Sequence, residues 1–323
     1  MSTHTVMTSK IIDAHCHIAS GEHIPRSFID GAVANMATAL AAKGVRVTHD
    51  KLAGMYEQKM QDPLCDALVA EMAEAGVSKS VLLAADFTYA LKDCAMTIEE
   101  SFHKHKEVLV RHPDKFEVFG GVDPRWGSDG LALFERSLAE FGFRGFKVYP
   151  PCGFSPSDPA LFPFYETCAA YRAPVVVHIG PTSPALSFDT SNPFLLDGAA
   201  RNFPTVNFIM AHGSISFTEE AAMMCAFRPN VYLDISGFQG SVQVGGSEGA
   251  VKAAVSRGIN HKILFGTDWP VFRLQGDQQT FIEAVTADDG PLSELSDAEK
   301  ALILYKNAER LLAGGAPAKQ STP

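Results

Sequence analysis

Eight short apolar runs alternate along this 323-residue chain with stretches of helical periodicity, and each run is followed by Gly, Pro or polar residues. The runs cover residues 10–17, 78–86, 117–124, 143–150, 173–180, 207–213, 231–237 and 262–270. Nearly continuous apolar strands separated by helices are typical of a parallel sheet that is buried on both faces. Eight such strands predict an α/β fold, a (β/α)8 TIM barrel, which needs roughly 250 residues and leaves room for an insertion.

An open, doubly wound sheet is the competing architecture. Such a sheet commonly carries a glycine-rich G-x-G-x-x-G turn after its first strand, where a dinucleotide binds. The first run here continues as His-Cys-His-Ile-Ala-Ser-Gly and contains no such turn. The barrel is therefore favoured.

The predicted helical insertion lies between strands one and two, at residues 18–61, and contains helical stretches at 27–43 and 50–61. A segment of this size at the catalytic end of a barrel forms a lid, a substrate wall or a subunit contact, or simply packs as an extra hairpin. We predict one barrel domain over residues 1–312 and a disordered tail over 313–323. Asp62 and Asp158 each precede a proline, which predicts that a helix starts at each position.

The net charge of the chain limits the classes of binding partner, and its cysteine pattern indicates the cellular compartment. The chain has 27 Lys and Arg against 37 Asp and Glu, a net charge of −10, which argues against nucleic acid or an anionic membrane as a partner. Residues 1–10 are polar and no apolar run reaches the ~18 residues of a membrane helix. The six cysteines are scattered, without a Cys-x-x-Cys pair, so we expect reduced thiols in a cytoplasmic protein.

Polar residues with metal-binding chemistry stand where the predicted strands end. The first strand ends Asp13-Ala14-His15-Cys16-His17. Because strand side chains alternate between two faces, we expect Asp13, His15 and His17 to share one face, while Ala14 and Cys16 share the other. Two imidazoles that point the same way can chelate one divalent ion, although an isolated His-x-His is more often a pair of surface residues.

Four further strand ends strengthen this hypothesis. The fourth strand ends with Lys147, the fifth with His178, the sixth with His212 and the eighth with Asp268. Charged groups after apolar strands are unfavourable to bury unless they pair or bind a metal. Active sites of barrels gather at the carboxyl ends of the strands, so one metal site accounts for all of them together.

With these motifs in the order Asp-x-His-x-His, Gly-Phe-Lys, His-x-Gly, Ala-His-Gly and Gly-Thr-Asp, the sequence resembles the amidohydrolase superfamily. Within it, the sequence is similar to the amidohydrolase-related branch, which contains aminocarboxymuconate semialdehyde decarboxylase, resorcylate-type decarboxylases and pyrone dicarboxylate hydrolase. The resemblance covers residues 11–312. Each motif alone is a weak signal, and their joint order is a strong one.

The resemblance implies one Zn²⁺ per chain, or another divalent metal, held by His15, His17, His178 and Asp268. A water molecule would fill the open position, and His212 would hydrogen-bond to that water and help to activate it. Asp268 would also take the proton of the water. A zinc-bound water has a pKa of roughly 7, and the metal also polarises a substrate carbonyl.

Two other residues receive roles from the resemblance. Asp13 matches a position that more often orients a ligand histidine than binds the metal itself. Lys147 matches a lysine that is carbamylated and bridges two metals in binuclear members, but is usually unmodified beside a single metal in this branch. We expect a single metal, with Lys147 near the substrate or paired with an acid. Two metals per chain, with one lost in Lys147→Ala, would support the alternative.

Substrate contacts are expected from Lys147, Tyr149, Arg125 and Trp269. Loop aromatics suit a planar ring and an arginine suits a carboxylate, although each of these residues could equally serve loop packing. No catalytic role is expected for the histidines in loops or on helical faces, namely His23, His49, His103, His105, His112 and His261. The apolar surface of the insertion and the resemblance make a homo-oligomer, a dimer, plausible.

Three functions are compatible with this pattern. The first is metal-dependent hydrolysis of an amide, lactam or lactone of a small aromatic or carboxylated molecule. The second is non-oxidative decarboxylation of an aromatic or muconate-like acid at the same site. The third is a barrel without catalytic metal that binds a ligand or partner, which the complete ligand set argues against.

Overall fold

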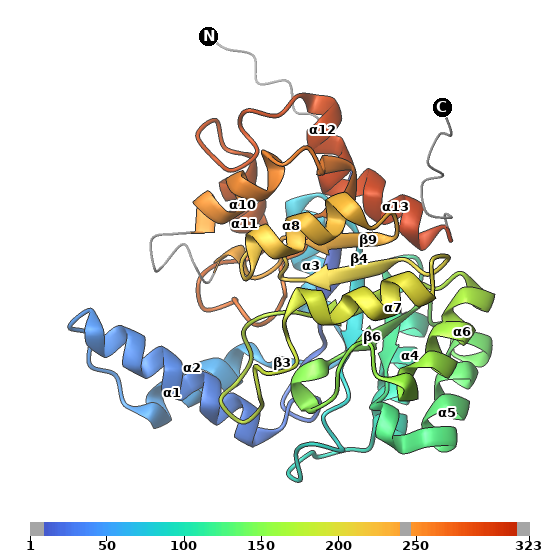
Figure 1. Ribbon diagram of the computed structural model, residues 1–323. Helices are drawn as coiled ribbons and strands as arrows, with labels where there is room; N and C mark the ends of the chain where they lie inside the picture. The colour runs from blue at the N-terminus through green and yellow to red at the C-terminus, as the bar shows by residue number, and fades with distance from the viewer. Residues whose placement is uncertain (1–9, 240–246, 315–323) are drawn as a thin grey trace.

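The computed structural model describes residues 10–239 and 247–314 of the chain. All eight predicted runs form strands of one parallel sheet, in the order in which they occur in the sequence. The prediction of a TIM barrel is confirmed, and flanking helices surround the strands (Figure 1). The barrel strands are β1 (Ile11–Cys16), β4 (Val77–Ala84), β5 (Phe116–Gly121), β6 (Gly145–Val148), β7 (Val175–His178), β8 (Phe208–Ala211), β9 (Val231–Asp234) and β10 (Ile263–Leu264).

The seam between the last strand and the first is made by residues at and just beyond the strand ends. The amide of Ala14 donates to the carbonyl of Phe265 at 2.9 Å, and the amide of Asp268 donates to the carbonyl of His15 at 2.8 Å. The amide of His17 donates to the carbonyl of Trp269 at 2.7 Å. Backbone hydrogen bonds therefore connect the two ends of the sheet at the carboxyl side of the strands.

Helices separate the strands of the barrel and follow the last of them. They are α3 (Asp66–Ala75), α4 (Ile98–Arg111), α5 (Gly127–Glu140), α6 (Phe162–Tyr171), α7 (Asp197–Asn202), α8 (Thr218–Phe227), α10 (Ser247–Val255), α11 (Gln278–Thr286), α12 (Asp297–Ala301) and α13 (Asn307–Leu312). Asp158 caps a short 3-10 turn before α6 through the amide of Ala160. Asp62 differs from the prediction: its helix begins only at Asp66, although its carboxylate still accepts from the amide of Leu68 in the first turn.

The insertion consists of α1 (Arg26–Ala42) and α2 (His49–Lys59), which project from one side of the barrel (Figure 1). Its two ends meet, because β2 (Ala19–Ser20) pairs antiparallel with β3 (Gln61–Asp62). No helix in the described ranges is both long and apolar enough to cross a membrane. From residue 315 on, the predicted disordered tail lies outside the described residues.

A cluster of apolar side chains fills the barrel, and seven of the eight strands contribute to it. Strand β6 instead contributes Lys147, which pairs in register with the interior Val176 of β7. On the other side of β6, the register places Gly145 beside the interior Phe119 of β5. A lysine thus occupies a place inside the barrel where the neighbouring strands present apolar residues.

The strict alternation expected for the first strand is interrupted. Ile12 and Ala14 belong to the interior cluster, so Asp13 lies on the opposite face of the strand. The pairing of β1 with β4 then shifts register between Asp13 and Cys16, as a β-bulge does. The prediction that Asp13 shares a face with His15 and His17 is therefore wrong. The irregularity brings His15 and His17 to the site while Asp13 contacts Thr267 and Gln278.

Gly145 provides a test of the interior packing. A Cβ at this position would lie 2.6 Å from ring carbons of Phe119. We expect Gly145→Ala to lower the free energy of unfolding by about 1–3 kcal/mol, as overpacked cores do. The control is Gly54→Ala in α2, where an added Cβ has nothing within 4 Å. Urea titration should show that this variant is more stable, by up to ~1 kcal/mol. Equal losses at both positions would contradict this view of the interior.

Candidate metal centre and substrate cavity

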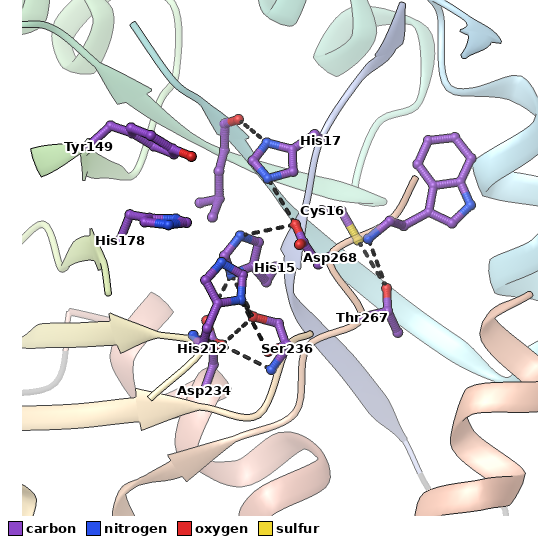
Figure 2. A network of polar contacts seen from close by, with 12 residues as sticks. His15, Cys16, His17, Tyr149, His178, His212, Asp234, Ser236, Thr267 and Asp268 are labelled. Carbon is purple, nitrogen blue, oxygen red and sulfur yellow. Dashed lines mark hydrogen bonds and ion pairs between the residues drawn. The ribbon is translucent and has the colours of Figure 1, made fainter. Parts of the chain in front are cut away.

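The polar residues predicted at the strand ends converge at the carboxyl side of the barrel (Figure 2). Residues His15, His178 and Asp234 lie within β1, β7 and β9, whereas His212 and Asp268 follow β8 and β10. His212 and Asp268 both have left-handed backbone conformations, with φ of 59° and 56°. Non-glycine residues seldom adopt these angles, and when they do they often lie at functional sites.

His15 is held through one ring nitrogen. Its Nδ1 lies 2.9 Å from Oδ2 of Asp234 and its Nε2 lies 3.5 Å from Oδ1 of Asp268. Burial lowers the pKa of His15 to about 4, against the attraction of Asp234, so the ring is neutral at pH 7. With the proton on Nδ1, the buried Nε2 carries a lone pair and makes no hydrogen bond to any described residue.

His17 has a similar orientation. Its Nδ1 lies 2.8 Å from the carbonyl of Leu83, which can only accept, so this nitrogen carries a proton. Its Nε2 lies 3.2 Å from Oδ1 of Asp268. Burial opposes ionisation of Asp268, but the positive charges of His15 and His17, when these rings are protonated, lower its pKa to about 2. The carboxylate is thus ionised at neutral pH.

These three residues form an arrangement that suits a cation. The ligand atoms of His15, His17 and Asp268 all lie within 4.8 Å of one another. The Nε2 of His15 and, in the neutral ring, the Nε2 of His17 direct lone pairs at an anionic oxygen, which is unfavourable unless a positive charge lies among them. Two imidazole nitrogens and one carboxylate oxygen are also ligands that divalent transition metals accept. The residues therefore fit the metal that the sequence resemblance implies.

A second triad, His15, His212 and Asp234, is equally compact but has a different chemistry. Asp234 accepts directly from Nδ1 of His15, from the amide of His212, and from the amide and hydroxyl of Ser236. Its carboxylate is therefore engaged by protein donors. His15 offers only Nε2 to a metal, and this atom already faces Asp268. The geometry thus supports one cation site with Asp234 behind it.

His212 is fixed by its Nδ1, which lies 3.1 Å from the carbonyl of Ser236. Since the carbonyl accepts, Nε2 is the ring atom of His212 that can take a proton. The ring centroid of His212 lies 4.8 Å from that of His15 and 4.9 Å from that of His178. The ring of His212 therefore lies beside those of His15 and His178.

His178 lies beside the three-residue group and belongs to neither triad. Its Nε2 donates to the carbonyl of Pro181 at 2.8 Å, which leaves a lone pair on Nδ1. Tyr149 lies over this ring, with the centroids 4.3 Å apart and the planes 31° apart. Figure 2 shows the two tilted rings at the left of the view, with His17 to their right.

Lys147 is almost fully buried, at 1 % exposure, and its Nζ has no hydrogen-bond partner among the described residues. Burial lowers the pKa of this ammonium to about 8, and the carboxylates of Asp234 and Asp268 limit the decrease. The Lys147 side chain is therefore mostly protonated at pH 7. The site thus contains a buried cation that lacks a hydrogen-bonding acceptor.

A cavity of about 320 Å³ opens from these residues. Lys147, Tyr149 and the ring of His178 line one side, and Phe28 and Phe87 continue the wall. Successive ring centroids along this wall, from Phe28 to Phe87 to Tyr149, lie 5.3 and 5.0 Å apart. Because Phe28 belongs to α1, the insertion supplies a wall of the cavity. The volume and the aromatic lining suit a small planar molecule.

Three other predicted site residues lie elsewhere. Asp13 accepts from the amide and hydroxyl of Thr267 and from the amide of His15, so it positions the backbone of His15 and does not contact the ring. Arg125 is paired with Asp123, with Nε to Oδ1 at 2.8 Å. Trp269 is buried, and its Nε1 donates to Glu71. Neither Arg125 nor Trp269 lines the cavity.

Sequence reasoning missed Asp234 and Ser236. Their signal was present in the seventh predicted strand, which reads Val-Tyr-Leu-Asp-Ile-Ser-Gly and so places a carboxylate directly after an apolar run. Nothing in that run indicates a partner for the carboxylate, because the partner, His15, is 219 residues away. The contact follows from the closed barrel, which brings β9 and β1 to the same end of the site.

Asp234 should control metal affinity through His15. We expect Asp234→Asn to weaken divalent metal binding by about 10- to 100-fold, since partners behind a ligand histidine fix its tautomer and orientation. Competition with a chelating dye measures this change. Asp86→Asn serves as a control, because Asp86 is equally buried but accepts from Thr88 and Trp126 outside the triads. Unchanged affinity in Asp234→Asn would contradict the arrangement described above.

Comparison with known proteins agrees with this architecture. A family model described as amidohydrolase matches residues 12–313. Protein fluG of Emericella nidulans is 26 % identical over 148 residues, which is 43 % of this chain and 17 % of that protein. The match thus spans about a sixth of the length of this curated relative.

Solved structures share the fold at low identity. A dihydroxybenzoic acid decarboxylase from Polaromonas sp. JS666, with bound manganese and 2-nitroresorcinol, is 18 % identical, with a TM-score of 0.63 over 94 % of this chain and 97 % of the other. A probable 2-pyrone-4,6-dicarboxylic acid hydrolase from Acinetobacter baumannii, with citric acid bound, is 14 % identical, with a TM-score of 0.60 over 94 % and 99 %. Because the family model spans the barrel and every residue of the metal group, the chain belongs to the amidohydrolase family.

Proposed function

We propose that this protein is a metal-dependent decarboxylase of a small planar carboxylic acid. The observation that carries the proposal is Lys147, a buried ammonium without a hydrogen-bonding acceptor in an aromatic-lined cavity beside the metal group. A substrate carboxylate would supply the missing acceptor, and charge-assisted hydrogen bonds of this kind are strong when buried. The fold it shares with a solved dihydroxybenzoic acid decarboxylase also supports the reaction.

The residues proposed to hold one divalent cation are His15, His17 and Asp268, with His178 as the fourth ligand through Nδ1. When bound, the metal would act as a Lewis acid that withdraws electron density from the coordinated oxygen of the substrate. Zn²⁺ suits the imidazole-rich set, and the Polaromonas decarboxylase holds manganese, so both ions belong in the test. Lys147 stays unmodified in this proposal, because the geometry supports one cation.

The protein groups then have separate tasks. Tyr149 and Phe87 hold the ring in the cavity, and Lys147 pairs with the carboxylate. The bond between the ring carbon and the carboxylate breaks, the electron pair stays on the carbon, and CO₂ leaves. One proton from solvent restores the balance, and Asp268 or His212 passes it to the carbon. The apolar wall favours release of the uncharged CO₂.

Hydrolysis, the first function weighed from the sequence, is the second candidate. Asp268 and His212 flank the proposed cation and can move protons from a water molecule to a leaving group. The fold shared with the probable pyrone dicarboxylic acid hydrolase supports this reaction. A carboxylated lactone would use the same pairing with Lys147.

One experiment separates these functions. Chelator-treated protein is reloaded with Mn²⁺ or Zn²⁺ and incubated in D₂O with hydroxy- and methoxy-substituted aromatic acids. We expect metal-dependent release of CO₂, with one deuterium at the vacated carbon of the product. If instead no acid loses CO₂ while a lactone or amide is opened with ¹⁸O from solvent, hydrolysis is the function. Failure of the chain to bind a stoichiometric metal, together with no turnover of the acids, lactones or amides, would leave a ligand-binding barrel.

A further inference from the structure

A second polar group lies on the wall of the cavity, and no part of the mechanism above uses it. It consists of His23, which follows β2, and of Ser101 and His105 on α4, and is called here the α4 cluster. All three residues line the cavity, and Ser101 and His105 are buried, at 7 % and 2 % exposure. No motif predicts either histidine at the site, because His23 lies in a loop and His105 is one of two histidines on α4.

The proton of His105 can be placed. Its Nδ1 lies 2.8 Å from the carbonyl of Ser101, one turn earlier in the helix, and so donates to it. Its Nε2 therefore carries a lone pair, and no described residue lies within hydrogen-bonding distance of this atom. Burial lowers the pKa of His105 to about 4, so the ring is neutral at pH 7.

His23 completes the cluster. Its Nδ1 lies 3.1 Å from the hydroxyl of Ser101, and its ring meets that of His105 edge to face, with centroids 5.1 Å apart. Burial also lowers the pKa of His23 well below its ordinary value. The cluster is thus uncharged, and it contains one fully buried ring nitrogen that no described residue engages, Nε2 of His105. An unsatisfied buried acceptor is unfavourable unless a ligand supplies a donor.

The α4 cluster and Lys147 are distinct parts of one cavity. The pKa of Lys147 is influenced by the charges of Asp234 and Asp268, at and behind the metal group. Within the metal group, His17 is the residue whose charge influences the pKa of both His23 and His105. Lys147, His23, Ser101 and His105 all line this cavity, so a molecule in it can lie against both the ammonium and the cluster.

We propose that the α4 cluster recognises a hydrogen-bond donor of the substrate, a hydroxyl or N–H group, which Nε2 of His105 accepts. This inference deepens the proposed function and rests on it for the carboxylate at Lys147. The substrate is then a planar acid that also carries a donor group away from its carboxylate. An anionic group is disfavoured at this place, because the neutral cluster offers no positive charge to offset its desolvation.

The test compares ligand pairs that differ in one donor. Binding of benzoate, 3-hydroxybenzoate and 4-hydroxybenzoate to the Mn²⁺-loaded protein is measured at pH 7 by calorimetry. Phenol and toluene form a second comparison that lacks the carboxylate. We expect the hydroxylated member to bind about tenfold more tightly in each comparison, as one additional hydrogen bond in an apolar cavity allows. His105→Leu should remove this preference, and His103→Leu, on the exposed side of the same helix, should keep it.

The outcomes distinguish this inference from the proposed function. Equal binding of phenol and toluene, or a phenol preference that survives in His105→Leu, overturns the α4 cluster as a recognition site. A phenol preference that depends on His105, without any decarboxylation or benzoate binding, overturns the proposed function and supports the cluster. If His105→Leu does not fold, ¹⁵N spectra of the histidines in the unaltered protein decide. Phenol should then shift the Nε2 resonance of His105, and an unchanged resonance refutes the proposal.

Discussion

Asp268→Asn is expected to abolish metal-dependent activity while leaving the metal-free protein at least as stable as the unaltered chain. In the metal-free protein the carboxylate faces the Nε2 atoms of His15 and His17 at 3.5 and 3.2 Å. An amide would instead donate a hydrogen to the lone pair on Nε2 of His15, which removes that repulsion. The same change removes the anionic ligand and the group that moves the proton. We expect activity to fall by roughly 10³-fold or more, given that proton transfer alone contributes about 10²–10⁴-fold.

Thermal unfolding with and without Mn²⁺ or Zn²⁺ measures the stability of the metal-free protein and the stabilisation that bound metal adds. A metal that binds only the folded state raises the melting temperature, and this increase should vanish in Asp268→Asn. Asp123→Asn is the control, since Asp123 is equally buried but pairs with Arg125 outside the cavity. It should lose stability and retain the metal-dependent increase. A metal-dependent increase in Asp268→Asn equal to that of the unaltered protein would refute the assignment of Asp268.

Lys147→Met should change activity and stability in opposite directions. Without the ammonium, we expect kcat/KM for a carboxylate substrate to fall on the order of 100-fold, because truncating one partner of a buried charge pair is strongly unfavourable. The metal-free protein should become more stable at pH 7. The pKa of Lys147 is about 8 in the folded chain against 10.5 ordinarily. At about 1.4 kcal/mol for each pKa unit, this difference corresponds to a gain on the order of 3 kcal/mol.

The free energy of unfolding of the unaltered protein should rise with pH as Lys147 loses its proton. Below pH 8 the lysine is protonated in both states and the folded state bears the full penalty of burial. Between pH 8 and 10.5 the unfolded chain binds more protons, so the stability of the unaltered protein rises with pH toward that of Lys147→Met. Lys262→Met is the matched control, because this buried ammonium donates to the carbonyls of Cys225 and Arg228. It should lose stability and keep its activity. A destabilised Lys147→Met would contradict the view that Lys147 lacks a partner.

The sequence predicted the barrel well because its strands are nearly continuous apolar runs. Such a run indicates a buried strand even when its neighbours in the fold are unknown. It located His15, His17 and Asp268 for a related reason, since every barrel gathers its strand ends in one place. Alternation failed at Asp13 because a β-bulge depends on the pairing with β4, which the first strand alone does not encode.

The remaining differences come from contacts between distant segments. Arg125 and Trp269 follow strands, as substrate-binding residues often do, but Asp123 and Glu71 hold them outside the cavity. His105 shows the reverse case. It is a helical histidine with no motif, and it reaches the cavity because α4 packs against β4 and β5 and because the segment after β2 brings His23 beside it. Pairwise contacts of this kind have no periodic signature in the chain.

The seam of the barrel has a consequence for how the fold would come apart. Its backbone hydrogen bonds join His15 and His17 to Asp268 and Trp269, and three of these four residues also supply the proposed metal ligands. An ion at this place would link the first and last strands of the barrel, β1 and β10. Chelation should therefore loosen this junction before the others, with amide hydrogen exchange accelerating first at residues 14–17 and 265–269 and the opposite side of the wall remaining protected.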